Sequence, residues 1–219
     1  MNSARSIDAF ETEFADPFGG ATRNALHGAA RRSSSGPPVP GEVGVWVFVL
    51  GDMIVFSVFF GVFAYSRSSQ VEVFEQARTT LNLCLGATNT LLLLTGSLFV
   101  ALAVHAVRAN ADRPAARLIA LALLCGTAFV ANKAIEYHSE VSTGHTPGTN
   151  DFYMYYFVFT GIHLLHLLLG LVVLTIMWRL VRRRVATLKD HATLESGAIY
   201  WHLVDLLWII LFPLLYLAR

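Results

Sequence analysis

The residues best placed to do chemistry in this chain are carboxylates and imidazoles that stand inside long apolar stretches. His202 and Asp205 are three residues apart in the last stretch, His163 and His166 are three apart in an earlier one, and Asp52 stands singly in the first. Residues three apart share one face of a helix. An ionisable side chain inside a membrane helix is costly unless a partner or water stabilises it, so such residues suggest function. The functions open to them are catalysis, proton movement, and holding a partner subunit or a lipid.

The composition predicts the elements that must position these residues. The chain is 55% hydrophobic and 14% charged, with 16 basic and 15 acidic residues. A soluble domain rarely has this balance, and the near-zero net charge gives no sign of a nucleic-acid partner. Each apolar stretch is close to the ~20 residues that span a bilayer. We therefore expect an all-α integral membrane bundle of five transmembrane helices, at 43–65, 81–107, 116–138, 152–178 and 199–218.

The distribution of basic residues predicts the orientation of the bundle. Residues 1–40 are polar and are interpreted as a flexible cytosolic tail, ahead of a membrane domain at 41–219. If the tail is cytosolic, that side holds Arg5, Arg23, Arg31, Arg32, Arg108, Arg113, Arg117, Arg179, Arg182, Arg183, Arg184 and Lys189. The other side has only Arg67, Arg78, Arg219 and the half-buried Lys133. The positive-inside rule then places the N-terminus in the cytosol and the C-terminus in the periplasm.

The position of each polar residue within its span predicts its depth. At a rise of ~1.5 Å per residue, Asp52 lies ~13 Å from the cytosolic face and His163 ~14 Å. His166 and Asp205 both lie at ~9 Å, and His202 at ~5 Å. We therefore expect Asp52 to meet His163 and Asp205 to meet His166, which would join the first, fourth and fifth helices through polar contacts.

A second polar group is expected near the opposite face. Lys133 and Glu136, at i and i+3, can neutralise each other on the third helix. The simpler interpretation is that Lys133 extends its ammonium to the outer interface. The two cysteines, Cys84 and Cys125, are expected in the core, at depths too different for a disulfide.

The paired histidines His163 and His166 also raise the hypothesis of bound metal or haem. A metal site would require further ligands nearby, and a bis-histidine haem would require another histidine at mid-membrane. We expect no metal site, no cofactor held by this chain and no catalytic residue, with neutral histidines hydrogen-bonding between helices. No nucleotide-binding glycine loop or hydrolase motif occurs in the sequence.

Basic and aromatic residues at the span ends predict contact with lipid headgroups. Arg182, Arg183 and Arg184 directly follow the fourth span, where they either attract anionic headgroups or only set the topology. Trp201, near the start of the last span, is expected at the headgroup level as part of an aromatic belt. A bound phospholipid is therefore a possible ligand.

Ordered motifs over residues 41–219 resemble subunit III of the haem-copper cytochrome c oxidases. Residues 200–208, YWHLVDLLW, resemble the family pattern YWHxxDxxW, and residues 160–170 resemble TGxHxxHxxxG. Residues 89–97 resemble NTxxLLxSS, and Glu136-Tyr137 matches the acidic–aromatic pair that closes the next helix. Long members of the family have seven spans, and this chain matches the last five.

The resemblance implies an accessory subunit of a bacterial respiratory complex in the cytoplasmic membrane. Such a subunit has no redox centre of its own, packs against the catalytic subunit, helps sustain proton uptake and guards against inactivation during turnover. The family's buried glutamate corresponds here to Asp52, one methylene shorter. Residues 41–53 are more similar to a short branch associated with nitric oxide reduction, so the catalytic partner is either an oxidase or a nitric oxide reductase.

Two other classes of function stay open at this point. One is a stand-alone proton-coupled transporter that uses Asp52, His163, His166 and Asp205 as a relay. Internal repeats and broken helices are typical of transporters, and neither is evident in the sequence. The other is an assembly factor that binds a respiratory complex transiently.

Overall fold

The computed structural model describes residues 43–183 and 188–217. Its long helices are α3 (Val43–Ser69), α5 (Leu83–Arg108), α6 (Asp112–Ser142), α7 (Asp151–Arg182) and α8 (Leu188–Phe212), and a short helix, α4 (Val71–Arg78), follows α3. Each of the five long helices is long and apolar enough to cross a membrane. The described residues contain no strand. The predicted all-α bundle of five spans is therefore confirmed, while the orientation of its ends stays a prediction.

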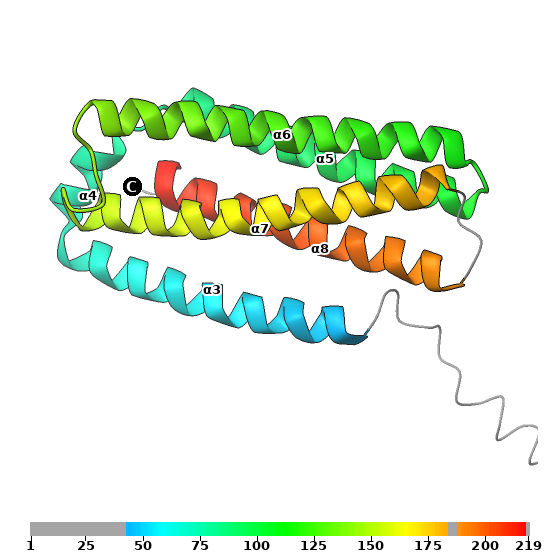
Figure 1. Cartoon of the computed structure of the whole chain (residues 1–219). Helices are drawn as coiled ribbons and strands as arrows, with labels where there is room; N and C mark the ends of the chain where they lie inside the picture. Colours follow the sequence, from blue (N-terminus) through cyan, green and yellow to red (C-terminus); the bar gives the residue numbers. More distant parts are fainter. Residues whose placement is uncertain (1–42, 184–187, 218–219) are drawn as a thin grey trace, which may run out of the picture. The chain divides into compact units, whose positions relative to one another are not determined.

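The helices run up and down, so their connections gather at two ends (Figure 1). The start of α3, the turn between α5 and α6, the end of α7 and the start of α8 lie together at one end. Helix α4 and the loop at residues 143–150 lie at the other end. Of the predicted cytosolic arginines, those that the structure describes lie at the first of these ends: Arg108, Arg113, Arg117, Arg179, Arg182 and Arg183.

Side-chain caps mark the starts of two of these helices, and a glycine follows the end of a third. Asn82 caps α5 by accepting from the backbone N–H groups of Cys84 and Leu85, and Asn150 caps α7 by accepting from that of Tyr153. Such caps satisfy N–H groups that have no partner within the helix. After α6, Gly144 takes a φ of +89°, which a residue without a Cβ adopts at little cost.

The last helix differs most from its predicted bounds of 199–218. Helix α8 begins at Leu188, eleven residues earlier, because a polar helix can continue into water beyond the hydrocarbon. Arg108 at the end of α5 forms an ion pair of 2.7 Å with Glu195 in this extension. At Pro213 the α-helix gives way to a π-helix, η1 (Pro213–Leu217). Proline has no N–H to continue the regular hydrogen-bond pattern.

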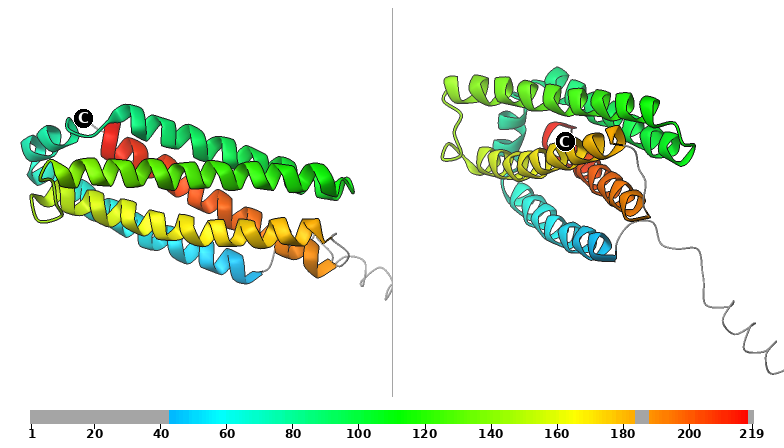
Figure 2. Two further views of the ribbon diagram at one scale, coloured as in Figure 1. Left: turned by 45° about the horizontal axis from the view of Figure 1, so that its top comes forward. Right: turned by 45° about the vertical axis from the view of Figure 1, so that its right-hand side comes forward.

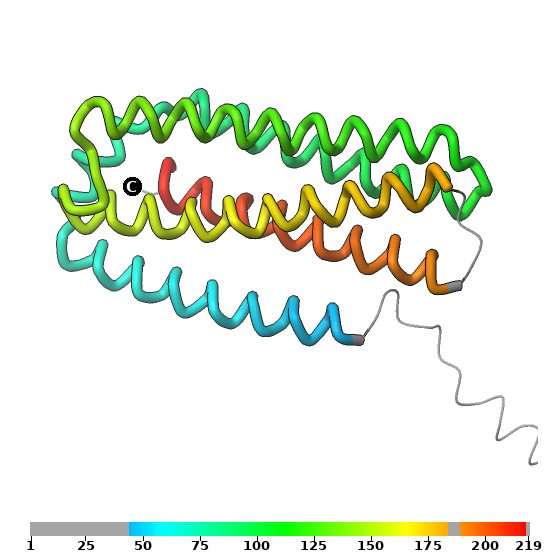
Figure 3. The backbone as a smooth tube through the Cα atoms, in the orientation of Figure 1, coloured from blue at the N-terminus to red at the C-terminus, as the bar shows by residue number. Residues whose placement is uncertain are grey.

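Helix α8 is the centre of the bundle and α3 is its periphery. Helix α8 packs against α5 and α7, and α6 packs against both of these (Figures 2 and 3). Half of the most apolar part of α8 is buried within the bundle, against 11% for α3. Cys84, expected in the core, is exposed on the first turn of α5, whereas Cys125 is half-buried. The face of α3 that points away from the bundle is left for lipid or another chain.

The indole of Trp201 fills the middle of the bundle, where three glycines leave room for it. Cβ atoms added at Gly126 and Gly170 would lie 2.9 and 3.1 Å from this ring, and one at Gly96 would lie 3.5 Å from it. Trp201 is 1% exposed. The expectation that Trp201 contacts lipid headgroups is therefore wrong. The glycines on α5, α6 and α7 have no side chains, and this leaves space in the core for the ring.

Adding one methyl group at Gly126 should destabilise the bundle. A Cβ there would lie 2.7 Å from Leu171 and 2.9 Å from Trp201. We expect Gly126→Ala to lower the free energy of unfolding, measured by equilibrium SDS unfolding, by about 1 to 3 kcal/mol.

Gly61→Ala is the matched control, because no atom lies within 4 Å of a Cβ added on α3. This substitution should leave the stability unchanged or raise it by about 0.5 to 1 kcal/mol, as alanine favours helix. Equal losses in both variants would contradict the packing described here.

Candidate functional site

Helices α3 and α7 are joined by a contact between the side chains of Asp52 and His166. The Nε2 atom of His166 lies 3.2 Å from Oδ1 of Asp52, and the two side chains are 14% and 11% exposed. The other ring nitrogen, Nδ1, lies 2.9 Å from the backbone oxygen of Ile162. A carbonyl can only accept, so Nδ1 carries a proton. Nε2 is therefore the ring nitrogen that faces the carboxylate of Asp52.

The predicted partner of Asp52 was wrong by one helical turn. Asp52 meets His166, and not His163. The surroundings of the pair are aromatic, since Phe56 packs edge-on against the His166 ring at a centroid distance of 5.8 Å. The hydroxyl of Tyr200 donates to the backbone oxygen of His166 at 3.1 Å, which brings α8 to the same point. Three helices therefore meet at His166, as the prediction of polar contacts between the first, fourth and fifth spans required.

His163 is completely buried and acts through its ring rather than through hydrogen bonds. The ring lies 5.6 Å from that of Phe129 and 5.1 Å from that of Trp208. Neither of its nitrogens has a hydrogen-bond partner among the described residues. The expected interhelical hydrogen bond of His163 is therefore not formed in this structure, and aromatic packing takes its place.

The pair on the last span contacts α5. The Nδ1 atom of His202 lies 2.6 Å from the hydroxyl of Ser97, and Ser97 is also the hydrogen-bonding neighbour of Asp205. Asp205 is 6% exposed and its Oδ1 has no partner among the described residues. The prediction that Asp205 meets His166 is wrong, because His166 is engaged by Asp52 and this face of α8 turns toward α5.

Lys133 and Glu136 form the core of a fully buried cluster near the opposite end of the bundle. The ammonium of Lys133 donates to Oε2 of Glu136 and to the hydroxyls of Tyr156 and Tyr216, each at 3.1 Å. Tyr156 donates to Oε1 of Glu136 at 3.0 Å, and Tyr216 donates to the same oxygen. An ammonium has three hydrogens to donate, and all three are used. The cluster joins α6, α7 and η1.

The expectation that Lys133 reaches the outer interface is wrong, although its predicted pairing with Glu136 is confirmed. The lysine is 1% exposed. Its nitrogen lies 4.6 Å from the ring centroid of Tyr156 and 5.4 Å from those of Tyr137 and Trp208. Aromatic faces attract cations, so the rings help to hold the ammonium away from water. The sequence motif that contains Glu136 could not predict its contacts with these tyrosines, which lie 20 and 80 residues further along the chain.

The basic residues after α7 have separate surroundings. The guanidinium of Arg182 stacks on the ring of Trp178, 4.7 Å from its centroid. Arg183 is exposed and ends the helix, and Arg184 lies outside the described residues. Their contact with lipid stays a prediction. Over residues 43–183 and 188–217, no three His, Cys, Asp or Glu side chains gather closely enough to hold a metal ion.

The fold and these contacts define a multi-pass α-helical membrane protein in which imidazoles, carboxylates and a lysine lie within the helix bundle. Residues 39–218 match the family of cytochrome c oxidase subunit III, so the chain belongs to this family, the third subunit of haem-copper oxidases.

Curated relatives agree with this assignment. The chain is 29% identical to cytochrome c oxidase subunit 3 of Thermostichus vulcanus, over 80% of this chain and 86% of the relative. It is 30% identical to cytochrome c oxidase subunit 3 of Synechocystis, over 80% of this chain and 74% of the relative. Quinol oxidase subunit 3 of Bacillus subtilis is 27% identical, over 80% and 85%. The resemblance seen in the motifs is thus confirmed, and the chain is a multi-pass bacterial membrane protein.

Proposed function

We propose that this chain is an accessory subunit that packs against the catalytic subunit of a haem-copper terminal oxidase in the bacterial cytoplasmic membrane, where it supports proton uptake and protects the complex during turnover. The observation that carries the proposal is the Asp52–His166 pair between α3 and α7. Imidazole and carboxylate side chains within a membrane are the groups from which proton relays are built. In the proposed role the pair collects or holds protons near the entrance to the catalytic subunit.

The outer face of α3 supports the proposed docking. Leu50, Ile54 and Val58 follow one another at intervals of four and are 62%, 66% and 58% exposed. The apolar face that they form contributes little to the bundle of this chain. An intramembrane partner that packed on this face would have α3 between it and the Asp52–His166 pair.

A nitric oxide reductase is the second candidate for the catalytic partner. The observation in its favour is the sequence of residues 41–53, which resembles the short branch associated with nitric oxide reduction. Both partners would leave the chemistry to a different subunit and give this chain the same supporting role.

Replacement of Asp52 in the assembled complex tests the supporting role. We expect Asp52→Asn to lower the steady-state turnover of the complex and to shorten its active lifetime, because an amide cannot bind and release a proton. The loss of turnover should be larger at high pH than at low pH, since a group that collects protons matters most when protons are scarce. Turnover and inactivation are measured over a range of pH with the purified complex.

Asp52→Glu keeps a carboxylate at this position and should retain most of the turnover. Glu72→Gln changes an exposed carboxylate on α4 and should leave turnover and lifetime unchanged. If Asp52→Asn keeps the full rate and lifetime at every pH, the pair has no part in proton supply and the proposed role fails.

A double-mutant cycle on Lys133 and Glu136 tests whether this buried pair stabilises the bundle. Removing one member of a buried ion pair leaves a charge without compensation, at a cost of about 3 to 5 kcal/mol. We expect Lys133→Met and Glu136→Met each to cost about this much in SDS unfolding, and the double variant to cost clearly less than their sum. Additive losses would show that the two side chains do not stabilise each other.

A further inference from the structure

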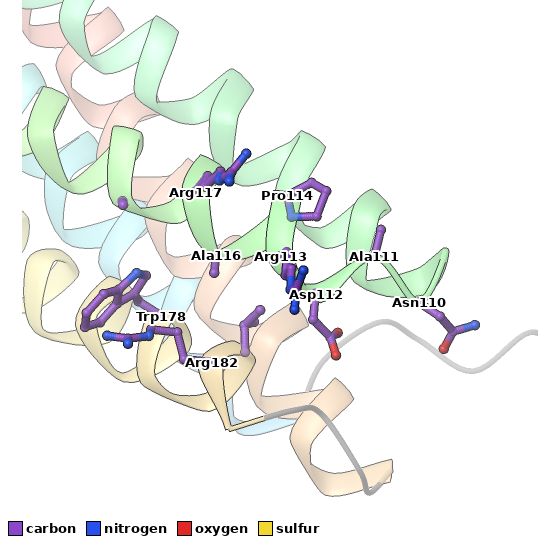
Figure 4. Close-up of a pocket in the computed structure, with 11 residues that line it drawn as sticks. Asn110, Ala111, Asp112, Arg113, Pro114, Ala116, Arg117, Trp178 and Arg182 are labelled. Carbon is purple, nitrogen blue, oxygen red and sulfur yellow. The ribbon is translucent and has the colours of Figure 1, made fainter.

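A pocket of about 860 Å³ lies between the start of α6 and the end of α7, at the end of the bundle that carries the predicted cytosolic arginines. Figure 4 shows that α6 supplies one side of the pocket and α7 the other. The polar residues in its lining are Asn110, Asp112, Arg113, Arg117 and Arg182. None of the residues considered above for proton transfer lines the pocket, so its chemistry is separate from theirs.

Three guanidinium groups make this pocket suited to an anion. Arg113 and Arg117 come from α6 and Arg182 comes from α7. The ion pairs of the described residues give none of them a carboxylate partner. The carboxylate of Asp112 also lines the pocket, so its side chains sum to two positive charges. Guanidinium groups bind phosphate oxygens through paired, charge-assisted hydrogen bonds.

One of the three arginines is already held in place. The guanidinium of Arg182 stacks on Trp178, whose ring also lines the pocket. This contact restricts the long side chain before any ligand arrives, which reduces the entropy lost on binding. Tryptophan is also enriched at the boundary between hydrocarbon and headgroups.

The size and walls of the pocket favour a lipid headgroup over a single inorganic ion. A volume of about 860 Å³ is in the range of sites for small organic molecules. Ala116, Ala120 and Val181 give it an apolar wall. Below Arg117, at i+4 and i+7 on the same helix, Leu121 and Leu124 are 42% and 64% exposed. Acyl chains could lie along these leucines while the headgroup stays at the arginines.

We infer that this pocket binds the phosphodiester headgroup of an anionic phospholipid through Arg113, Arg117 and Arg182. Of the residues that the sequence suggested for headgroup contact, only Arg182 takes part, and two arginines from the start of α6 join it. The binding does not depend on which catalytic subunit is the partner, so its failure and the failure of the proposed oxidase role are distinguishable.

The test is native mass spectrometry of the full chain in mild detergent, titrated with phosphatidylglycerol, phosphatidylcholine or inorganic phosphate. We expect retained adducts with phosphatidylglycerol, few with phosphatidylcholine and none with phosphate. The double variant Arg113→Gln, Arg182→Gln should weaken the phosphatidylglycerol adduct by about ten-fold or more, because each basic residue contributes to the attraction. Arg113→Lys, Arg182→Lys keeps the charge and should retain part of the binding.

A matched control separates a built site from a diffuse basic surface. Arg179→Gln, Arg183→Gln removes the same charge from two exposed arginines at the same end of α7, outside the pocket. It should weaken the adduct by no more than about two-fold. Equal losses in the two charge-removing variants, equal binding of phosphatidylcholine, or saturable binding of phosphate alone would each overturn the inference.

Discussion

The ammonium of Lys133, buried inside a membrane helix, depends on partners from three parts of the chain. Glu136 lies on the same helix, but Tyr156 comes from α7 and Tyr216 from η1. Because an unpaired charge in hydrocarbon is costly, any arrangement of the helices that separates these groups is strongly disfavoured. The interaction therefore fixes η1 against α6 and α7. Arg78 of α4 donates to the backbone oxygen of Tyr216 at 3.2 Å and adds the short helix to the same assembly.

With one end of the bundle fixed in this way, close packing aligns its middle. The Trp201 ring occupies space that glycines on α5, α6 and α7 leave open, and α8 is thereby held among them. Among the contacts of residues 43–183 and 188–217, those of α3 include aromatic contacts and the Asp52–His166 pair, and no buried cluster like that of Lys133. The element that carries the proposed proton group is thus also the one with the largest face left for a partner. This arrangement suits a subunit whose function is completed by another chain.

The sequence was sufficient for the fold and for the family, because both depend on features that are local in the chain. Apolar length predicted the five spans, and ordered motifs such as YWHLVDLLW predicted the family. The pairing of side chains was less predictable. A shift of three residues moves a side chain by only about 4.5 Å along a helix, so depth alone could not separate His163 from His166 as the partner of Asp52. Depth also carries no information about the face that a residue presents.

The predicted surroundings of Trp201 and Lys133 were wrong because they depend on packing between distant segments of the chain. Trp201 has the position of an interfacial residue in its own span, and its burial depends on glycines in three other helices. The occurrence of Gly96, Gly126 and Gly170 in separate spans was the available signal. Lys133 has the position of a residue that could reach water, and its burial depends on tyrosines far along the chain. Only a structure brings such groups together.

The most direct test of the account is to purify the chain from its native membrane in a mild detergent and to identify what accompanies it. We expect a haem-containing catalytic subunit of an oxidase, or of a nitric oxide reductase, to co-purify in a fixed ratio and to show its haem spectrum. We also expect the isolated chain to carry no haem of its own. A homogeneous protein that leaves the membrane alone and transports a solute after reconstitution would contradict the proposed role as a subunit.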